Sequence, residues 1–301
     1  MPMAFESFDL NEYDVILSST SSCAKGVVTR PDTVHICYCH TPMRYAWEFY
    51  YEYTENIGGL KKKLLKYAMN YIRLWDRVAA DRVDYFIANS QYVANRIWKH
   101  YRRKSTVIYP PVNTEYYTPE GEKEEIYLCL SRLVKYKKVD LAVEAFNRIG
   151  KKLVVIGGGE QLDYLKSIAK PNIIFLGRQP DEVVREYYRK CKAFIFPGEE
   201  DFGITPVEAQ ACGTPVIAYG KGGATETVID GITGVFFKEQ TEESLIDAVD
   251  RFEKISIDSG VCRENAEKFG IERFEHQMKN YVEYCCQHKT VHQNEIDIEN
   301  F

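Results

Sequence analysis

The chain has 301 residues, of which 45% are hydrophobic and 28% charged, and a formal net charge of −5 at pH 7. A chain of this length exceeds one typical hydrophobic core, so two packed units are expected. No apolar run approaches the roughly 18 residues of a membrane-spanning helix, and the opening MPMAFESFDL lacks the basic and apolar regions of a signal peptide. We therefore expect a cytoplasmic protein that neither spans a membrane nor is secreted.

The nine cysteines lie mostly inside apolar segments and show no C-x-x-C spacing of the kind that binds zinc. They are expected to be reduced thiols of the core. The sequence predicts no metal site.

Short β-branched segments alternate with helical patterns along the first third of the chain. They predict strands in YDVILSS, VHICYCH, YFIANS and STVIYPP, which begin at Tyr13, Val34, Tyr85 and Ser105. This alternation is typical of a parallel sheet covered by helices. Residues 1–112 are therefore expected to form one α/β domain.

The alternation restarts at EIYLCLSRL and continues through KLVVIGGG, NIIFLG, AFIFPG, TPVIAYG and GVFF, with amphipathic helices between these strands. We expect a second α/β domain over 123–275 and a linker over 113–122, where prolines and turn residues cluster. A C-terminal helix and tail are expected over 276–301, with VHQNEIDIENF fraying at the end.

Residues 60–104 are basic within an acidic chain, because twelve Lys and Arg against three Asp give +9 and leave −14 elsewhere. A helix predicted over 60–79 has an apolar face and a basic face. The apolar face holds Leu60, Leu64, Ala68, Ile72, Trp75 and Ala79, and the basic face holds Lys62, Lys63, Lys66, Arg73 and Arg77. Such a helix could lie on an anionic membrane or cover a sheet. Nucleic acid is disfavoured because no recognition motif accompanies the charge.

The segment FPGEEDFGITPVEAQACGTPVIAYGKGG begins at Phe196 and predicts a buried strand, a loop and a helix. Thr205 is predicted as the N-cap of this helix, Pro206 as its first residue and Gly213 as its end. Free amides at residues 203–205, with the helix dipole behind them, suit a phosphate group.

Two acids flank these amides. Glu200 lies in the loop and Glu208 lies about one turn into the helix, and each carboxylate can accept hydrogen bonds from neutral hydroxyls. Sugar hydroxyls, phosphates and ribose hydroxyls would fit this order, which suggests a nucleoside diphosphate sugar. Alternatively, both acids serve only to offset the helix dipole.

Two cations follow the strand at LSRLVKYKK, where Arg132 and Lys138 could neutralise a departing diphosphate. The alternative is solvent-facing charge, which is preferred for Lys135 and Lys137. Three further turns could approach a ligand. Gly158 lies in a glycine-rich turn, Arg178 and Gln179 could face a base, and GKGGATETV has amides free for anions.

His40 ends the predicted strand in CYCHTPMRYAW. A single histidine in such a place serves a structural role or a functional one. Its position at the carboxyl end of a strand favours function, because ligands of open α/β sheets bind there.

These motifs resemble the retaining family 4 of glycosyltransferases, also called glycosyl transferases group 1. EDFGITPVE corresponds to that family's E-x7-E signature, and SR with Lys138, GGG, FLG and ACGTPVIA correspond to other parts of its donor domain. HICYCHTPMRYAW and IANSQYVANRI further resemble mannosyltransferases of the WbaZ type, which build surface polysaccharides. The resemblance implies the GT-B fold, in which two Rossmann-like domains face a cleft.

The resemblance also implies roles. Glu200 and the amides of Phe202, Gly203 and Ile204 would hold the donor sugar, Thr205 would approach the phosphates, and Glu208 would bind the ribose. The same resemblance implies that the leaving diphosphate would be stabilised by Arg132 and Lys138. The base would lie next to Arg178 and Gln179, and the sugar would contact His40. No metal or other cofactor is implied.

The implied activity is retaining transfer of a hexose, mannose from GDP-mannose, onto a glycan or lipid-linked acceptor. The implied place is the cytoplasm or the inner face of the membrane, with the basic helix as a peripheral membrane contact and no nucleic-acid partner. Nothing before Tyr13 resembles the family's first strand and glycine-rich loop, so the N-terminal domain is expected to be incomplete. The alternatives are a catalytically impaired nucleotide-sugar-binding remnant and a nucleotide-sugar epimerase.

Overall fold

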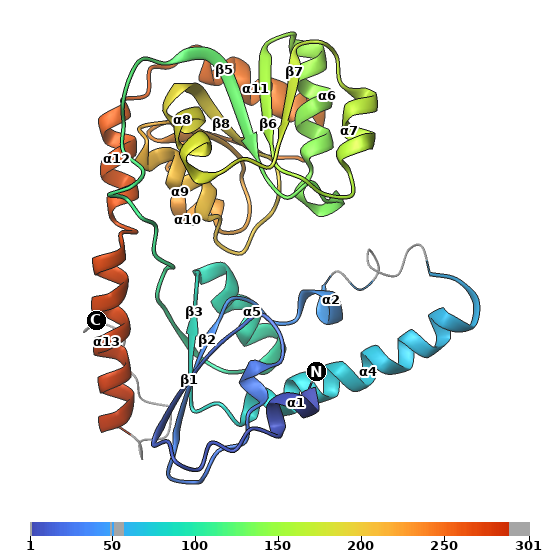
Figure 1. Cartoon of the computed structure of the whole chain (residues 1–301), viewed down its shortest axis with the longest axis vertical. Helices are drawn as coiled ribbons and strands as arrows, with labels where there is room; N and C mark the ends of the chain where they lie inside the picture. The colour runs from blue at the N-terminus through green and yellow to red at the C-terminus, as the bar shows by residue number, and fades with distance from the viewer. Residues whose placement is uncertain (1, 49, 51–56, 289–301) are drawn as a thin grey trace. The chain divides into compact units, whose positions relative to one another are not determined.

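The computed structural model describes residues 2–48, 50 and 57–288. The chain divides into unit 1, residues 1–109 and 275–301, and unit 2, residues 110–274. Each unit contains its own parallel sheet (Figure 1), so the prediction of two α/β domains is confirmed. The terminal segment VHQNEIDIENF lies outside the described residues.

Unit 1 is built on four parallel strands in the order β1-β2-β3-β4. Each lies in a segment whose apolar pattern predicted it, and β2 is buried along its whole length. Their bounds are Val15–Thr20, Val34–Cys39, Tyr85–Ala88 and Ser105–Val107.

The helices of unit 1 are α1 (Pro2–Glu6), α2 (Arg44–Trp47), α4 (Gly59–Asp81), α5 (Gln91–Tyr101) and most of α13 (Ile271–Gln287), together with the 3₁₀ turn η1 (Ala24–Gly26). The Ser90 side chain accepts a hydrogen bond from Val93 N and so caps the start of α5. One core cluster forms between β2, β3, α5 and the end of α4, where Cys37, Phe86, Ile97 and Tyr101 are buried.

Unit 2 is built on six parallel strands in the order β10-β9-β8-β5-β6-β7. The apolar segments of the second half predicted all six. They are β5 (Glu124–Leu130), β6 (Lys152–Ile156), β7 (Ile173–Gly177), β8 (Cys191–Phe196), β9 (Val216–Tyr219) and β10 (Gly234–Phe237).

Helices cover both faces of this sheet (Figure 1). A large apolar cluster joins one face to α6 (Val139–Ile149), α7 (Leu162–Ile168) and α11 (Glu242–Phe252). On the other face, Tyr188 of α8 packs edge-on against Phe194 of β8 with ring centroids 5.5 Å apart. The remaining helices are α8 (Asp181–Lys190), α9 (Ile204–Ala211), α10 (Ala224–Thr227) and α12 (Ser259–Glu267), and η2 covers Lys135–Lys137.

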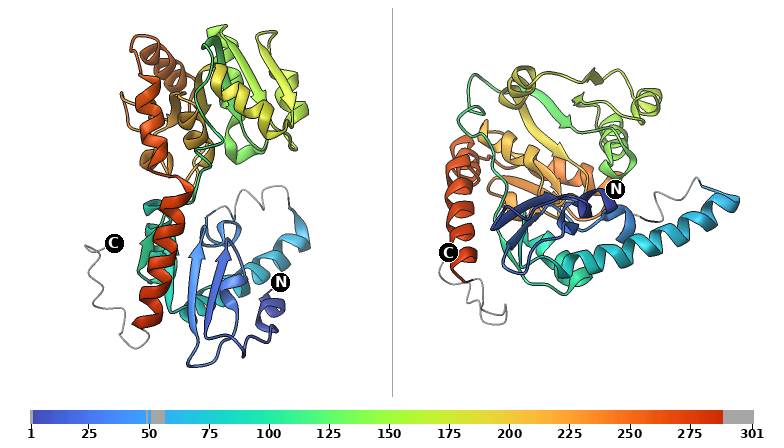
Figure 2. Two further views of the ribbon diagram at one scale, coloured as in Figure 1. Left: turned by 60° about the vertical axis from the view of Figure 1, so that its left-hand side comes forward. Right: turned by 60° about the horizontal axis from the view of Figure 1, so that its bottom comes forward.

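The helix predicted over 60–79 is α4, which extends away from the sheet of unit 1 (Figure 2). Trp75 and Ala79 are buried as predicted, but Leu64 and Ala68 are exposed and do not belong to the inward face. The side chain of Leu60 lies outside the described residues. The helix therefore has a second, outward apolar stripe, which consists of Leu64, Tyr67, Tyr71, Leu74 and Val78, each more than half exposed.

Candidate functional site

The site in unit 2 lies where the strand order reverses. The chain runs from β5 outward to β6 and β7 and then returns to β8, which pairs with β5 on its other side. The loop after β5 therefore leads toward β6 on one side, and the loop after the neighbouring β8 leads toward β9 on the other side. Such a switch point is where open α/β sheets bind ligands.

Contacts between these two loops bring Lys137 and Glu200 together. The Lys137 Nζ pairs with Glu200 Oε1, and the two side chains are 21% and 15% exposed. A methyl group on Gly198 would lie 3.1 Å from Lys137 O, so the absence of a side chain there allows the loops to approach. The preference for Lys137 as a solvent-facing charge is therefore wrong.

The start of α9 differs from the prediction. Gly203 is its N-cap and has φ +85°, a left-handed conformation that favours glycine, so the helix begins at Ile204. Thr205 is the second helical residue and not the cap, and Pro206 is the third, where a missing N–H still costs no helical hydrogen bond. Gly213 follows the helix at φ +70°, as predicted.

The amides at the start of α9 are open. The N–H groups of Gly203, Ile204 and Thr205 have no acceptor among residues 2–48, 50 and 57–288. Phe202 is 3% exposed, and the centroid of its ring lies 5.6 Å from that of Phe269, so the turn is anchored by the packing of these rings. Open amides on an anchored turn can bind an anion.

The turn Gly222–Gly223 supports the loop after β8. Gly223 N donates to Glu200 O (2.8 Å), and Glu200 and Gly222 form a parallel bridge. A methyl group on Gly223 would lie 2.3 Å from the Phe202 Cα. The sequence GKGGATETV suggested amides that are free to bind an anion. The amide of Gly223 is instead occupied, because it donates to Glu200 O and holds Glu200 in place.

The glycine-rich turn after β6 approaches protein backbone. A methyl group on Gly157 would lie 1.9 Å from Ser131 O, and one on Gly159 would lie 2.3 Å from Leu133 O. These glycines therefore let the turn pack against the loop after β5. Gly158 lies beside Arg178, because a methyl group on Gly158 would lie 3.2 Å from Arg178 Nε.

The remaining predicted residues of this loop region have separate surroundings. Arg132 and Arg178 are exposed, and the Gln179 Nε2 donates to Leu176 O (2.6 Å) within its own turn. Lys138 forms no ion pair with any described residue and has φ +54°, a left-handed conformation that joins η2 to α6.

Glu208 is partly buried in α9 and binds protein hydroxyls. The Tyr188 Oη donates to Glu208 Oε2 (3.0 Å), and the Tyr117 phenol also lowers the pKa of this carboxyl. Burial raises the pKa of Glu208 to about 7, an effect that the two phenols reduce and Asp181 increases. Sequence reasoning missed both tyrosines, because nothing in the local spacing pairs them with position 208.

His40 lies at the end of β2 in unit 1, as predicted. Its Nε2 is 2.9 Å from the Ser19 Oγ, its ring packs edge-on against Tyr38, and partial burial lowers its pKa. Its predicted contact with a donor sugar stays a prediction.

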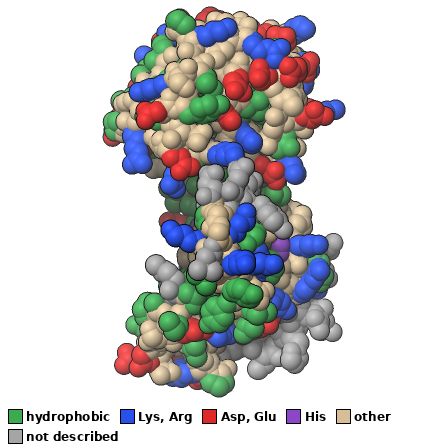
Figure 3. All heavy atoms as spheres, turned by 90° about the vertical axis from the view of Figure 1, so that its right-hand side faces the viewer, with side chains coloured by type: hydrophobic (Ala, Val, Ile, Leu, Met, Phe, Trp, Pro, Cys, Tyr) green, Lys and Arg blue, Asp and Glu red, His purple; other side chains and the backbone are tan. Residues whose placement is uncertain are grey.

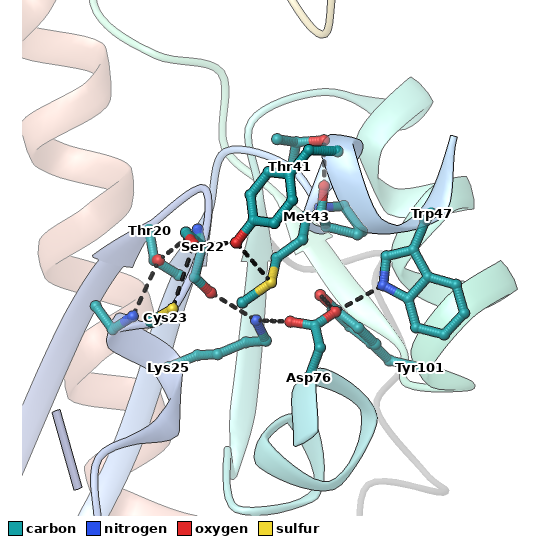
Figure 4. Close-up of polar contacts among 12 residues, drawn as sticks. Thr20, Ser22, Cys23, Lys25, Thr41, Met43, Trp47, Asp76 and Tyr101 are labelled. Atoms are coloured by element: carbon teal, nitrogen blue, oxygen red, sulfur yellow. Dashed lines mark hydrogen bonds and ion pairs between the residues drawn. The ribbon is translucent and has the colours of Figure 1, made fainter. Parts of the chain in front are cut away.

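Unit 1 also contains a buried polar network (Figure 4). Lys25 and Asp76 are 1% and 0% exposed and form an ion pair, and the Lys25 Nζ also donates to Ser22 O (2.7 Å). The Asp76 Oδ2 accepts hydrogen bonds from Trp47 Nε1 (2.7 Å) and Tyr101 Oη (2.8 Å). The network ties the loop after β1 to α2, α4 and α5. Because each charge is the partner of the other, removal of either one would leave an uncompensated buried charge and destabilise unit 1.

In the part of the chain that the structure describes, no three His, Cys, Asp or Glu side chains gather to hold a metal ion. Nor does any described helix have the length and apolarity to cross a bilayer.

Two family descriptions match the chain. Residues 117–269 match "Glycosyl transferases group 1" and residues 2–116 match "Glycosyltransferase Family 4". The "Alpha-1,3/1,6-mannosyltransferase ALG2" of Kluyveromyces lactis is 26% identical over 73% of this chain and 53% of its own length. A "GDP-mannose-dependent alpha-(1-6)-phosphatidylinositol monomannoside mannosyltransferase" of Mycolicibacterium smegmatis is 28% identical over 46% of this chain and 44% of its own. The chain thus spans about half the length of the curated relatives it matches.

Solved structures share the fold. The crystal structure of Anabaena Alr3699/HepE in complex with UDP aligns with a TM-score of 0.68 and 18% identity over 91% of this chain and 79% of that one. This likeness confirms the GT-B class of two Rossmann-like units. The first family description covers more than half of the sequence and contains the switch-point loops, so the chain belongs to the glycosyl transferases group 1 family.

Proposed function

We propose that this protein transfers a hexose from a nucleoside diphosphate sugar, with retention of configuration, to a glycan or lipid-linked acceptor. The observation that carries this proposal is the junction of the loops after β5 and β8. There the Lys137–Glu200 pair lies next to the open amides of Gly203, Ile204 and Thr205. Cation, carboxylate and amides are the groups that a sugar diphosphate needs.

We propose the following roles, which this geometry supports. The amides at the start of α9 bind a donor phosphate and Glu200 accepts hydrogen bonds from the sugar. The leaving diphosphate is stabilised by Arg132 together with either Lys137, the last residue of η2, or Lys138, its C-cap. The side-chain pairing of Lys137 favours it over Lys138 for this task.

In the proposed mechanism the diphosphate leaves through an oxocarbenium-like state and the acceptor hydroxyl attacks from the same face. Glu200 is paired with a cation, which suits positioning of the sugar better than nucleophilic attack. We assign contact with the sugar to His40, and contact with the base to Gly158, Arg178 and Gln179.

An Arg132→Ala variant tests the electrostatic part of this mechanism. We expect turnover to fall by about 10²-fold, because a preorganised cation stabilises the departing charge. Transfer is measured with radiolabelled donor. The control is Arg148→Ala, at an exposed guanidinium in the last turn of α6 that pairs with Glu242 and Glu243 of α11. Unchanged turnover in the first variant contradicts the assignment.

We propose GDP-mannose as the donor, since two relatives bear mannosyltransferase names and one of those names specifies GDP-mannose. The fold neighbour was solved with UDP, which makes UDP-glucose the proper comparison. Thermal shifts against GDP-mannose and UDP-glucose at rising concentration identify the donor, because ligand binding to the folded state raises stability with concentration.

Two other functions predict different products. A binding remnant would bind the donor without transfer. The observation that favours it is that unit 1 has four described strands, whereas unit 2 has six. An epimerase would convert the donor without any acceptor. Product analysis with and without acceptor distinguishes both from a transferase.

We also propose that α4 contacts an anionic membrane surface from the cytoplasmic side. Its outward stripe of Leu64, Tyr67, Tyr71, Leu74 and Val78 repeats every three or four residues, which is the spacing of one helix face. The exposed Lys61, Lys62, Lys63 and Lys66 begin the same helix and have no acidic partner among the described residues. Figure 3 looks onto this end of unit 1 and shows hydrophobic and basic side chains next to one another.

These features favour lipid over a second copy of the chain. Two copies packed in parallel would bring their lysines together, whereas anionic headgroups attract lysines and tyrosine rings suit the membrane interface.

Vesicle sedimentation tests this contact. Vesicles of phosphatidylcholine with phosphatidylglycerol should bind the protein, and binding should weaken with salt. Tyr67→Ser with Leu74→Ser should lower the partition coefficient by more than about tenfold, whereas Tyr164→Ser, at an exposed tyrosine of α7, should not. Equal binding by all variants, or a soluble dimer that these changes dissociate, contradicts the proposal.

A further inference from the structure

Glu208 is held by groups from two elements outside its own helix. Tyr188 belongs to α8 and is fully buried, and Tyr117 belongs to the connection before β5 and is 8% exposed. The two rings pack edge-on with centroids 5.8 Å apart. The Tyr188 hydroxyl donates to the carboxyl of Glu208, and the Tyr117 phenol favours the ionised form of that carboxyl.

The backbone at Tyr188 is also fixed. Its carbonyl accepts hydrogen bonds from the Thr214 hydroxyl and the Lys123 Nζ. Thr214 is the third residue after α9, so the end of α8 is tied to the chain shortly after the helix that carries Glu208. The Tyr188 hydroxyl therefore has little freedom to leave the carboxyl.

The hydrogen-bonding capacity of the Glu208 carboxyl indicates what kind of ligand it can bind. An ionised carboxylate has about four acceptor positions, and the Tyr188 phenol occupies one of them. The remaining positions can accept two adjacent hydroxyls, which is the chemistry of a vicinal diol such as that of a ribose. A protonated carboxyl loses acceptor capacity and would bind a diol less well.

We propose that Tyr188 is a positioning residue of the donor site, whose phenol keeps Glu208 oriented and ionised so that the carboxylate accepts both hydroxyls of the nucleotide's ribose. This inference rests on the proposed function, because it takes a nucleotide as the ligand.

The groups around Glu208 decide the direction of the effect. Burial and Asp181, at the start of α8, disfavour the charge of Glu208, and the two phenols favour it. The nearest cations of α8 have other partners, since Arg189 binds Thr118 O and Glu186, and Arg185 lies over the Tyr116 ring. Removal of the Tyr188 hydroxyl therefore leaves Glu208 more easily protonated.

The experiment is a Tyr188→Phe variant of the whole chain, with UDP and GDP as probes in calorimetric titrations from pH 6 to pH 9. In the wild type, affinity should rise with pH as Glu208 loses its proton, since its pKa is about 7. In the variant this rise should move to higher pH. Affinity should then be about fivefold lower at pH 7 and close to that of the wild type at pH 9.

Tyr127→Phe is the matched control. Tyr127 is 1% exposed and also donates its hydroxyl to a carboxylate, that of Glu253, away from the switch point. This variant should keep the wild-type pH profile. If both variants shift it equally, loss of a buried phenol alone explains the effect and the inference is wrong.

A measurement without ligand separates this inference from the proposed function. The carboxyl of Glu208 is titrated by ¹³C NMR in the free protein, where Tyr188→Phe should raise its pKa and Tyr127→Phe should not. An unchanged titration overturns the inference even if nucleotide binds. A shifted titration with no binding of either nucleotide instead overturns the role of Glu208 as a ribose acceptor, and the proposed function with it.

Discussion

Two neighbouring lysines, Lys137 and Lys138, show how the backbone decides which side chain serves the site. Lys137 ends η2 and pairs with Glu200, whereas Lys138 has φ +54° and ψ +35° and caps α6. A left-handed conformation costs a residue with a Cβ atom about 1 kcal/mol or more. The backbone therefore sets Lys138 in the connection between two helices, and its neighbour reaches the acid.

Lys138→Gly tests this division of roles. We expect the free energy of unfolding to rise by about 0.5–1 kcal/mol, because glycine adopts this conformation without strain. Arg102→Gly, at the other non-glycine residue with positive φ, should stabilise similarly in urea unfolding.

Donor affinity is the second measurement on these lysines. It should survive Lys138→Gly and fall about tenfold in Lys137→Ala. If Lys138→Gly loses donor affinity and Lys137→Ala keeps it, Lys138 is the lysine that binds the diphosphate.

At the scale of elements, the site depends on how closely three loops approach one another. Gly198 contacts the backbone of Lys137, and Gly223 contacts the backbone of Phe202. Parallel strands deliver these loops to one edge of the sheet, and glycines allow the final contact. The position of Glu200 is therefore a property of the packed loops as much as of its own sequence.

Gly223→Ala should disrupt this packing. The added methyl group would lie 2.3 Å from the Phe202 Cα, and backbone cannot yield as a flexible side chain can. We expect a loss of about 3 kcal/mol or more in chemical denaturation, with loss of donor binding. Gly231→Ala, at φ +74° in open space, should cost only about 1 kcal/mol and keep donor binding.

The sequence predicted the elements better than the contacts between them. The ten described strands lie in short β-branched or apolar segments bounded by turn residues, so local pattern was sufficient even for the partly exposed β1 and β4. The Lys137–Glu200 pair was missed because it depends on β8 returning beside β5, which no local pattern encodes. The start of α9 was misplaced because Thr205 has the chemistry of a cap, while Gly203 has the backbone freedom that the turn requires.

The outward stripe of α4 was missed for a similar reason. Its apolar residues occupy two faces of one helix, and a single helical period assigned Leu64 to the wrong one. The partners of Glu208 come from distant elements, so only the packed structure reveals them. In contrast, His40 was placed correctly, because the end of a buried strand can be recognised from the residues next to it.

At the scale of the whole molecule, the candidate donor groups belong mainly to unit 2, which has its own sheet and its own core. Ligand binding stabilises the part of a protein that it contacts, and hydrogen exchange reports such local stability.

Hydrogen exchange with and without the donor nucleotide tests this allocation. We expect slower exchange in the loops over 131–138, 157–159 and 197–208, while the core strands β2 and β3 of unit 1 remain unchanged. Protection confined to unit 1 would contradict a donor site at the switch point of unit 2.

The distribution of thiols gives the molecule two internal reporters. Unit 1 contains Cys23, Cys37, Cys39, Cys285 and Cys286, unit 2 contains Cys129, Cys191, Cys212 and Cys262, and all except Cys286 are buried. An alkylating reagent can therefore modify a buried thiol only after the surrounding unit opens. Mass spectrometry of the alkylated peptides would time the opening of each half separately, without any engineered label.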